Sequence, residues 1–306
     1  MSEIVLAFDT SNYTTSCAFF DGQTGANSGR LLPVPEGQLG LRQSEALFSH
    51  IKNLPEVMDK LAREGKIIAV GASSKPRENE DSYMPCFLAG STQASVTAKA
   101  LNVPCRFFSH QQGHIAAAAW SAGRLELLDR PMLAWHLSGG TTELLYVRPK
   151  GTAVECEIIG KTTDVSAGQL IDRTGVLLGL QFPAGKALDA LAKQARNRTK
   201  YDPKLSGLDF SLSGVEHKMK QMLEKGVDAS DAAYFALCSV TSTVKRVTAR
   251  ARDKFGDMPV LFSGGVASNS LLREIMTDGI FAESRFSTDN AMGAAILTYR
   301  AVKNGE

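Results

Sequence analysis

Leu133-Ala-Trp-His-Leu-Ser-Gly-Gly-Thr-Thr-Glu-Leu-Leu-Tyr-Val147 decides the fold, because apolar residues flank a small polar centre. That pattern predicts two antiparallel strands joined by a tight glycine turn. Gly139 and Gly140 leave the backbone N–H groups of the turn uncovered, so a phosphate can come within hydrogen-bonding distance of them. The side chains of Ser138 and Thr141 add hydroxyl donors. We therefore expect a nucleotide phosphate to bind at this turn.

The same layout occurs near the N-terminus, in Leu6-Ala-Phe-Asp-Thr-Ser-Asn-Tyr-Thr-Thr-Ser-Cys-Ala-Phe-Phe20. When the two sequences are aligned so that Ser11 meets Ser138, identical residues coincide at both ends of the turn. Two unrelated hairpins are the alternative explanation. We infer two similar α/β domains, each of which opens with a hairpin that presents its turn to a common cleft. The first spans residues 1–125, completed by the C-terminal helix 290–304, and the second spans residues 126–289.

The bulk composition is that of a globular protein, with 306 residues, 43% of them hydrophobic and 22% charged. A formal net charge of +2 provides no global basic field, so nucleic-acid binding requires local patches. Five scattered cysteines without CxxC spacing argue against a disulfide framework or a zinc knuckle. No apolar run reaches membrane-spanning length, and we expect a soluble, cytoplasmic protein without a membrane partner.

The rest of the chain predicts alternating helices and strands. Helices are expected at residues 44–63 (interrupted near Pro55), 88–101, 110–120, 165–180, 185–194, 214–225, 230–254, from about 269, and from about 290 to 303. Strands are expected at residues 67–73, 103–109, 152–163 and 259–263. Residues 22–40 are expected to form a loop or short edge strand, residues 74–85 an irregular loop whose role the sequence does not give, and residues 196–213 a polar linker.

Two histidines spaced by four residues, His110 and His114, form a candidate metal site. On the predicted helix their imidazoles share one face and can bind one ion. Gln111 stands where the HExxH metalloproteases have their general base, which disfavours a peptidase. Structural histidines at a helix start are the alternative. Asp289 is the candidate third ligand, with an ordinary helix N-cap as its alternative role.

His136 is a further candidate ligand, because in the second hairpin it occupies the position that Asp9 occupies in the first. Its neighbours Trp135 and Leu137 are expected to point to the opposite face of the strand. A core histidine hydrogen-bonded to backbone is the alternative. Histidine nitrogens combined with one carboxylate suit iron, zinc or manganese and leave coordination positions open for a substrate. We take His50 and His217 as helix-surface residues.

A second glycine turn, in the segment Phe262-Ser-Gly-Gly-Val-Ala-Ser-Asn269, joins a predicted strand to a helix. Gly264 and Gly265 allow the backbone to approach a nucleotide, although a tight strand–helix turn alone needs the same residues. Further along the cleft, two carboxylates and one glycine bracket Pro183, and they either bind ribose hydroxyls or face solvent: Asp172, Gly185 and Asp189.

Two clusters of basic residues are the candidates for binding nucleic acid. The first lies in the irregular linker and is the better candidate; it contains Lys193, Arg196, Arg198, Lys200 and Lys204. The second has helical spacing, which predicts a solvated helix face; it contains Lys245, Arg246, Arg250, Arg252 and Lys254. Neither cluster has many aromatic residues between its cations.

Taken together, the motifs resemble the TsaD family, the tRNA adenosine threonylcarbamoyltransferases once described as O-sialoglycoprotein endopeptidases, or glycoproteases. The resemblance covers nearly the whole chain, and the motifs occur in the family's order. They are Asp9-Thr10-Ser11, His110-Gln-Gln-Gly-His114, Ser138-Gly139-Gly140-Thr141, Asp164 to Asp172, Phe182-Pro-Ala-Gly185, Phe210-Ser-Leu-Ser-Gly214, Gly264-Gly-Val-Ala-Ser-Asn269 and Thr288-Asp289-Asn290.

The resemblance implies an actin-like ATPase (ASKHA) fold, an α/β fold with two ribonuclease-H-like domains around a central cleft. It implies one divalent or ferric metal ion, iron or zinc, held by His110, His114 and Asp289, and it places His136 where archaeal and eukaryotic members have a ligating Tyr. It also implies an adenine nucleotide, as an acyl-adenylate, AMP or ATP. Its binding positions match Ser138, Gly139, Gly140, Asp172, Gly185 and Asn269, with Asp189 a further ribose candidate.

Several positions depart from the family pattern. Members usually have His or Asn at the position of Thr141, Gly-Gly at Ala184-Gly185, and a Gly-rich loop at residues 74–85. The first hairpin lacks the usual Cys-Asp-Glu after its Thr-Ser. The positions for metal and nucleotide are largely kept, whereas the loop that would face the acceptor is changed. These differences are typical of a divergent member.

We predict an acyltransferase that moves a threonylcarbamoyl or carbamoyl group from an acyl-adenylate to an acceptor amine, with the exocyclic amine of a tRNA adenosine as the leading acceptor. The expected partners are the adenylate, a tRNA and accessory subunits of a transfer complex. A carbamoyltransferase with a non-tRNA acceptor and a non-catalytic nucleotide-binding scaffold are the alternatives. The acceptor, the metal, the partner subunits and the oligomeric state cannot be read from the sequence.

Overall fold

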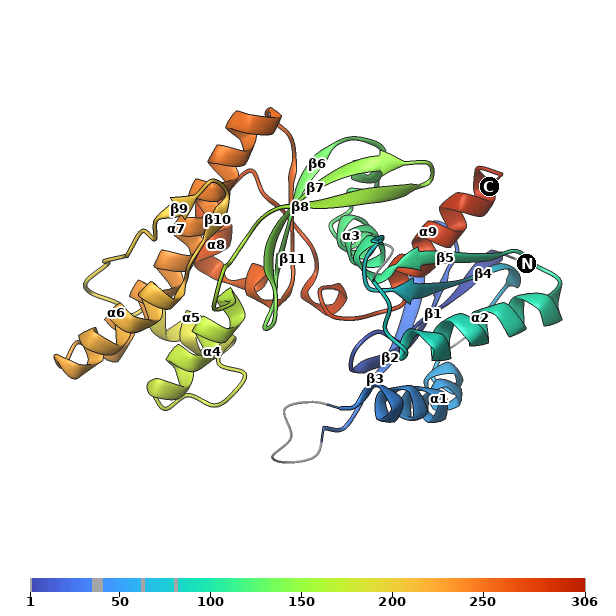
Figure 1. Ribbon diagram of the computed structural model, residues 1–306, viewed down its shortest axis with the longest axis horizontal. Helices are drawn as coiled ribbons and strands as arrows, with labels where there is room; N and C mark the ends of the chain where they lie inside the picture. The colour runs from blue at the N-terminus through green and yellow to red at the C-terminus, as the bar shows by residue number, and fades with distance from the viewer. Residues whose placement is uncertain (1, 35–40, 62–63, 80–81, 306) are drawn as a thin grey trace. The chain divides into compact units, whose positions relative to one another are not determined.

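The computed structural model describes residues 2–34, 41–61, 64–79 and 82–305, which form two compact units (Figure 1). Unit 1 contains residues 1–130, 148–156 and 285–306, and unit 2 contains residues 131–147 and 157–284. From the sequence we predicted domain boundaries between residues 125 and 126 and between residues 289 and 290. Parts of three predicted segments, 22–40, 44–63 and 74–85, lie outside the described residues.

Unit 1 is built on a five-stranded mixed sheet in the order β3-β2-β1-β4-β5. Its strands are β1 (Glu3–Asp9), β2 (Thr14–Phe20), β3 (Gly25–Leu31), β4 (Lys66–Lys75) and β5 (Cys105–Ser109). The β1–β2 and β2–β3 pairs are antiparallel, whereas β1–β4 and β4–β5 are parallel. The carboxyl ends of β1, β4 and β5 therefore meet at one edge, where Asp9, Ser73 and Ser109 lie.

Helices cover both faces of this sheet. The helices of unit 1 are α1 (Gln43–Asp59), α2 (Phe87–Leu101), α3 (His110–Ser121) and α9 (Met292–Lys303), with a short 3-10 helix at Leu125–Asp129. Leu6 and Phe8 of β1 pack in one apolar cluster with residues of α1 and α2. On the other face, the Phe20 ring meets the Tyr299 ring of α9 edge-on, with centroids 5.5 Å apart.

Two details of α1 differ from the sequence prediction. The helix continues through Pro55, which lies on its exposed side. Proline has no N–H to donate, so one backbone carbonyl of the preceding turn loses its partner. Because that carbonyl is open to water, the helix tolerates the proline. His50 is fully buried rather than on the helix surface. Its Nδ1 lies 2.8 Å from Thr15 Oγ1, because α1 packs this face against β2. Burial lowers the pKa of His50, so its imidazole is a neutral core group.

The sheet of unit 2 has the strand order β12-β11-β6-β7-β8. Taken from β8 to β12, this order matches the sheet of unit 1 strand for strand. The strands of unit 2 are β6 (Met132–Leu137), β7 (Thr142–Lys150), β8 (Ala153–Lys161), β11 (Val260–Ser263) and β12 (Ile280–Phe281). β6 pairs antiparallel with β7 and parallel with β11, as β1 does with β2 and β4. The two predicted hairpins therefore occupy the same place in two copies of one topology.

The helices of unit 2 are α4 (Ala167–Leu177), α5 (Gly185–Ala192), α6 (Ser213–Glu224), α7 (Ala229–Phe255) and α8 (Ser270–Ile275). Short strands β9 (Leu205–Ser206) and β10 (Asp209–Phe210) lie in the predicted linker. Trp135 of β6 is fully buried in the core, and its Nε1 donates to Thr248 Oγ1 of α7 at 2.9 Å. Within the described residues, no helix is both long and apolar enough to cross a membrane.

Two glycines face each other where α3 packs against α9, and the close contact requires glycine at one of them, Gly293. A Cβ at Gly293 would overlap the Gly113 carbonyl group, whereas a Cβ at Gly113 would come no closer than 3.7 Å to any atom. We expect Gly293→Ala to lower the free energy of unfolding by about 1–3 kcal/mol, because the two helix backbones must separate. Urea denaturation at neutral pH measures this loss.

Gly113→Ala is the matched control, since it changes the other side of the same contact. We expect it to be neutral or stabilising by up to about 1 kcal/mol, because alanine favours the helix. Equal denaturation midpoints for Gly293→Ala and the wild type would contradict the close approach of α3 and α9.

Candidate functional site

The first candidate site lies in unit 1, where α3 begins at His110. Ser109 starts this helix as its N-cap: Ser109 Oγ accepts from Gln112 N, and Gln112 Oε1 accepts from Ser109 N. His110 and His114 then lie on successive turns of the same face, with ring centroids 4.2 Å apart. Both side chains are mostly buried.

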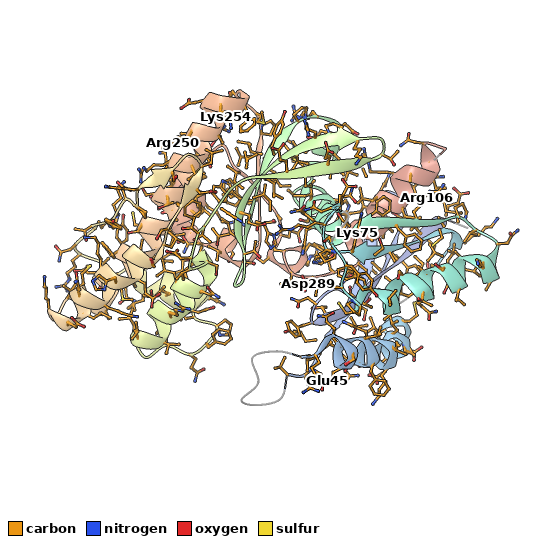
Figure 2. The ribbon with its side chains drawn as sticks, viewed as in Figure 1. Glu45, Lys75, Arg106, Arg250, Lys254 and Asp289 are labelled. Atoms are coloured by element: carbon orange, nitrogen blue, oxygen red, sulfur yellow. The ribbon has the colours of Figure 1, made fainter. Side chains whose placement is uncertain are left out.

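Asp289, labelled in Figure 2, reaches the two histidines from the segment before α9. Its Oδ1 lies 3.3 Å from His110 Nε2 and 3.4 Å from His114 Nε2. The neighbouring Asn290 supplies the capping hydrogen bond to α9, since its Oδ1 accepts from Met292 N. The carboxylate of Asp289 is therefore free of the capping role that was its alternative.

Asp9, at the end of β1, is the functional residue that the sequence did not identify as a partner of this site. Its Oδ2 lies 2.9 Å from His110 Nδ1 and accepts from Ser73 Oγ at 2.5 Å. Its Oδ1 accepts from the backbone N–H and the hydroxyl of Ser11. The carboxylate is 1% exposed, so these contacts fix its orientation. One signal was present: parallel β1 and β4 bring Asp9 and Ser73 to the same edge of the sheet.

The two carboxylates determine the charge of His110. Burial alone would raise the pKa of Asp9 and of Asp289 and lower that of His110. The opposite charges and their hydrogen bonds outweigh burial. They hold the pKa of both carboxyl groups below the ordinary value and raise the pKa of His110 to about 10. In the metal-free site His110 is therefore a cation held between two anions.

The donor set is suitable for a metal ion. Among the described residues, His110, His114 and Asp289 form the one group whose ligand atoms all lie within 4.8 Å of one another. Two imidazole nitrogens and a carboxylate oxygen match the preferences of zinc and iron. Asp9 holds His110 Nδ1, which leaves Nε2 to face the ion, as the outer partners of metal-binding histidines do.

His136 belongs to unit 2 and lies on β6. Trp135 and Leu137 on either side are fully buried while His136 is partly exposed, which agrees with the predicted alternation of faces. Its Nδ1 lies 3.3 Å from Ser263 Oγ of β11. Its role as a metal ligand stays a prediction.

The second candidate site is the turn between β6 and β7 in unit 2. Ser138 and Thr141 close the turn, since Ser138 N donates to Thr141 O and Thr141 N donates to Ser138 Oγ. A Cβ at Gly139 or Gly140 would meet nothing within 4 Å. Packing does not require glycine at either position. Their bare backbone instead opens onto free space, as a phosphate-binding turn requires.

The N-terminus of α4 packs directly against this turn. Its N-cap Ser166 donates from Oγ to Gly139 O at 2.6 Å, and Ala167 N donates to Thr142 Oγ1. A Cβ at Gly168 would meet Gly139 Cα and Ser138 O at 2.5 Å, so this close approach requires glycine. The positive end of the helix dipole therefore lies beside the turn, which favours an anion there.

A pocket of about 650 Å³ opens beside the turn within unit 2, a size ordinary for a small-molecule site. Gly139, Asp172 and Gly185 line it. Asp172 Oδ1 accepts from Ala184 N at 2.8 Å and so holds the loop before α5. A second pocket of about 660 Å³ shares Gly139, Asp172 and Phe182 with the first.

Gly265, Asn269 and Asp189 also line the first pocket. Asn269 caps α8 by accepting from Leu272 N, and its Nδ2 donates to Asp189 Oδ1. Asp189 therefore positions Asn269. A Cβ at Gly264, with φ at +90°, would overlap Leu137 backbone atoms, so Gly264 is needed for packing, whereas Gly265 borders open space.

Asp164 fixes the segment that leads into α4. Its carboxylate accepts from Val165 N at 2.6 Å, Leu212 N at 2.8 Å and Ser211 Oγ at 2.5 Å. It thereby ties the start of α4 to the start of α6. Burial opposes ionisation, but these hydrogen bonds hold the pKa of Asp164 well below its usual range.

Comparison with known proteins gives one family. The family described as "TsaD: tRNA N6-adenosine threonylcarbamoyltransferase" matches residues 83–296. A protein of that name from Lacticaseibacillus casei is 30% identical, over 90% of this chain and 82% of its own length. Another, from Thermus thermophilus, is also 30% identical and covers 98% of this chain and 94% of its own length.

Solved structures support the fold at low sequence identity. Full-length HypF in its phosphate- and nucleotide-bound form has a TM-score of 0.62 and 14% identity, over 98% of this chain and 56% of its own. Component A of (R)-2-hydroxyglutaryl-CoA dehydratase from Acidaminococcus fermentans has a TM-score of 0.55 and 16% identity, over 99% of this chain and 100% of its own. The predicted actin-like α/β fold is confirmed.

We expect Asp164→Asn to lower the melting temperature near neutral pH, because the amide cannot accept all three hydrogen bonds. The folded pKa of Asp164 is depressed, so its stabilisation is complete above the unfolded value of 3.8 and is lost as the pH falls. The gap between wild type and variant should therefore narrow at about pH 3. Thermal melts at the two pH values measure it.

Asp59→Asn, at an exposed position at the end of α1, is the matched control and should leave the melting temperature unchanged. If Asp164→Asn had the same melting temperature as the wild type near neutral pH, the carboxylate would not hold α4 in place.

Proposed function

The chain belongs to the TsaD family of tRNA N6-adenosine threonylcarbamoyltransferases, and from this premise we propose that it transfers a threonylcarbamoyl group from an acyl-adenylate to the exocyclic amine of a tRNA adenosine. One observation carries the proposal: the chain combines a two-histidine, one-carboxylate cluster in unit 1 with an open glycine turn beside a helix N-terminus in unit 2. A tRNA substrate would place the reaction in the cytoplasm.

Unit 2 holds the nucleotide part of the adenylate. Its phosphate binds at the bare backbone of Gly139, Gly140 and Gly265, where the α4 dipole favours an anion. Asp172 and Gly185 line the pocket for the ribose. Ser138, Thr141, Asn269 and Asp189 shape the two turns around it, the last by positioning Asn269.

Unit 1 would hold a metal ion through His110 Nε2, His114 Nε2 and Asp289, with His136 as a further predicted ligand. An iron or zinc ion bound there would supply positive charge that polarises the reacting acyl group. Asp9 keeps the His110 ring in the orientation that points Nε2 at the ion. His110 must give up its proton at Nε2 when the ion binds.

In the transfer, the amine nitrogen attacks the carbonyl carbon of the acyl–phosphate anhydride. The bond between that carbon and the phosphate oxygen breaks, AMP leaves, and the amine loses a proton to solvent. The N–H groups of the Gly139–Gly140 turn stabilise the charge that grows on the leaving phosphate. The chain contributes chiefly by positioning the two reactants, and accessory subunits stay an expectation.

The proposed activity is tested by incubating the metal-loaded protein with threonylcarbamoyl-adenylate and unmodified tRNA, followed by mass analysis of the nucleosides. We expect adenosine to gain a threonylcarbamoyl group. The variant His110→Ala/His114→Ala should lose bound metal in elemental analysis and transfer at least about 100-fold less, since even outer-shell changes cost up to that much. His217→Ala, on the exposed surface of α6, is the matched control.

Equal metal content in the double variant and the wild type would refute the metal site. Transfer of the group to a small molecule while tRNA stays unmodified would favour a carbamoyltransferase with a different acceptor. Nucleotide binding without any transfer would favour a scaffold.

Gly139→Asp tests the nucleotide site, because its side chain fills the open space beside the turn and repels phosphate. We expect the affinity for AMP, measured by calorimetry, to fall at least about tenfold, as a loss of about 1.4 kcal/mol would give. Gly29→Asp, at an exposed position of β3 where a Cβ would come no closer than 3.6 Å to its nearest neighbour, is the control. Unchanged affinity in Gly139→Asp would contradict the proposed phosphate position.

A further inference from the structure

We propose that unit 2 carries a binding ridge for the phosphate backbone of a structured RNA, formed by residues 193–207 and the part of α7 from residue 242 to residue 254. This inference rests on the proposed function, because the RNA it names is the tRNA substrate. It adds a binding surface for the tRNA that is separate from the reacting groups.

The two basic clusters of the sequence form one surface in the structure. The linker runs along α7 and is tied to it by hydrogen bonds from residue 196 onward. Tyr201 N donates to Ser239 Oγ at 2.8 Å, Arg246 Nη1 donates to Pro203 O at 2.9 Å, and Arg250 Nη1 donates to Gly207 O at 3.1 Å. Figure 1 shows β9 and β10 beside α7. The second cluster is therefore more than a solvated helix face.

The ridge concentrates positive charge in a chain that is otherwise nearly balanced. Its two segments contain ten lysines and arginines against two aspartates, whereas the net charge of the whole chain is only +2. Three carboxylates outside the segments, Asp189, Asp257 and Asp278, pair with two of these ten cations. Arg250 and Lys254 lie one turn apart near the C-terminal end of α7 (Figure 2). Lys204 and Lys245 are exposed and have no ion pair within the described part of the chain. Such a field favours a polyanion.

The two basic clusters contain few aromatic residues, but aromatic rings at neighbouring positions lie beside their cations. The Arg198 guanidinium lies 5.6 Å from the Tyr234 ring centre, and Lys254 Nζ lies 5.0 Å from that of Phe255. Both rings are partly exposed. Phe255 stacks on Tyr146 with ring centroids 5.0 Å apart, so Tyr234 is the ring that offers a stacking surface to a nucleic-acid base. Tyr234 and Phe255 are separated by about 30 Å along α7 at the usual helical rise, which is long enough for several phosphate contacts.

An acidic membrane surface is a weaker match for the same charge. Helices that bind membranes insert large apolar side chains beside their cations. The large apolar side chains that are exposed in the described residues all lie outside the ridge. Polar and charged groups cover the ridge itself, which suits an RNA backbone.

The test uses the full-length protein and a fluorescently labelled, unmodified tRNA transcript. The ridge variant replaces four exposed cations that hold no backbone carbonyl: Arg198→Gln, Lys204→Gln, Lys245→Gln and Lys254→Gln. The control variant removes the same charge elsewhere: Lys60→Gln, Lys66→Gln, Lys99→Gln and Lys225→Gln. Fluorescence anisotropy gives the affinity at several salt concentrations. Calorimetry with AMP and elemental analysis report whether both candidate sites remain intact.

We expect the ridge variant to bind tRNA at least about tenfold more weakly at physiological salt, and its salt slope to fall by about 3, since each phosphate contact contributes about 0.7–0.9. AMP affinity and metal content should not change, and the control should bind as the wild type does. Hydrogen exchange of the wild type should show protection by tRNA at residues 193–207 and 242–254, independent of any variant.

Equal affinities and slopes for the ridge variant and the wild type would overturn the ridge, as would a wild type that binds acidic vesicles through these residues but not tRNA. The two proposals fail separately. A protein that transfers the group to tRNA while its ridge variant binds tRNA normally keeps the proposed function and loses the ridge. A protein that binds tRNA through the ridge but modifies nothing keeps the ridge and loses the function.

Discussion

The contact between the buried Asp9 carboxylate and the His110 imidazole is the interaction on which the candidate metal site depends. A carboxylate that is 1% exposed is costly to ionise unless donors surround it. Ser11 of the β1–β2 turn, Ser73 of β4 and His110 of α3 supply those donors. The sheet of unit 1 therefore fixes one nitrogen of His110. The other nitrogen is left to face His114 and Asp289.

The duplicated topology explains why two different sites arise at equivalent places. In both units, the turn between the first two strands lies at the carboxyl end of a central strand. In unit 1 that end carries Asp9, and Ser11 closes back onto its carboxylate. In unit 2 the equivalent turn closes through Ser138 and Thr141, and Gly139 stays bare for an anion. The same backbone thus gives a buried carboxylate beside His110 in one copy and an open glycine turn in the other.

The sequence was sufficient to predict the features that depend on residues close together in the chain. The hairpins, the shared face of His110 and His114, and the glycine turns all follow from local patterns. Asp289 was a candidate from its place before the last helix, and the family resemblance agreed with it. Longer-range packing decided the rest. Asp9 meets His110 across 101 residues, which requires the order of strands to be known. His50 is buried because α1 packs against β2, a contact that helix periodicity alone does not specify.

Anomalous diffraction from the metal-loaded protein tests most directly that Asp9 orients His110 for the ion without binding it. We expect one ion within coordination distance, about 2.0–2.2 Å, of His110 Nε2, His114 Nε2 and an Asp289 oxygen, with Asp9 still hydrogen-bonded to His110 Nδ1. An ion that coordinates Asp9, or one that binds elsewhere while the two histidines and Asp289 keep their present contacts, would contradict it.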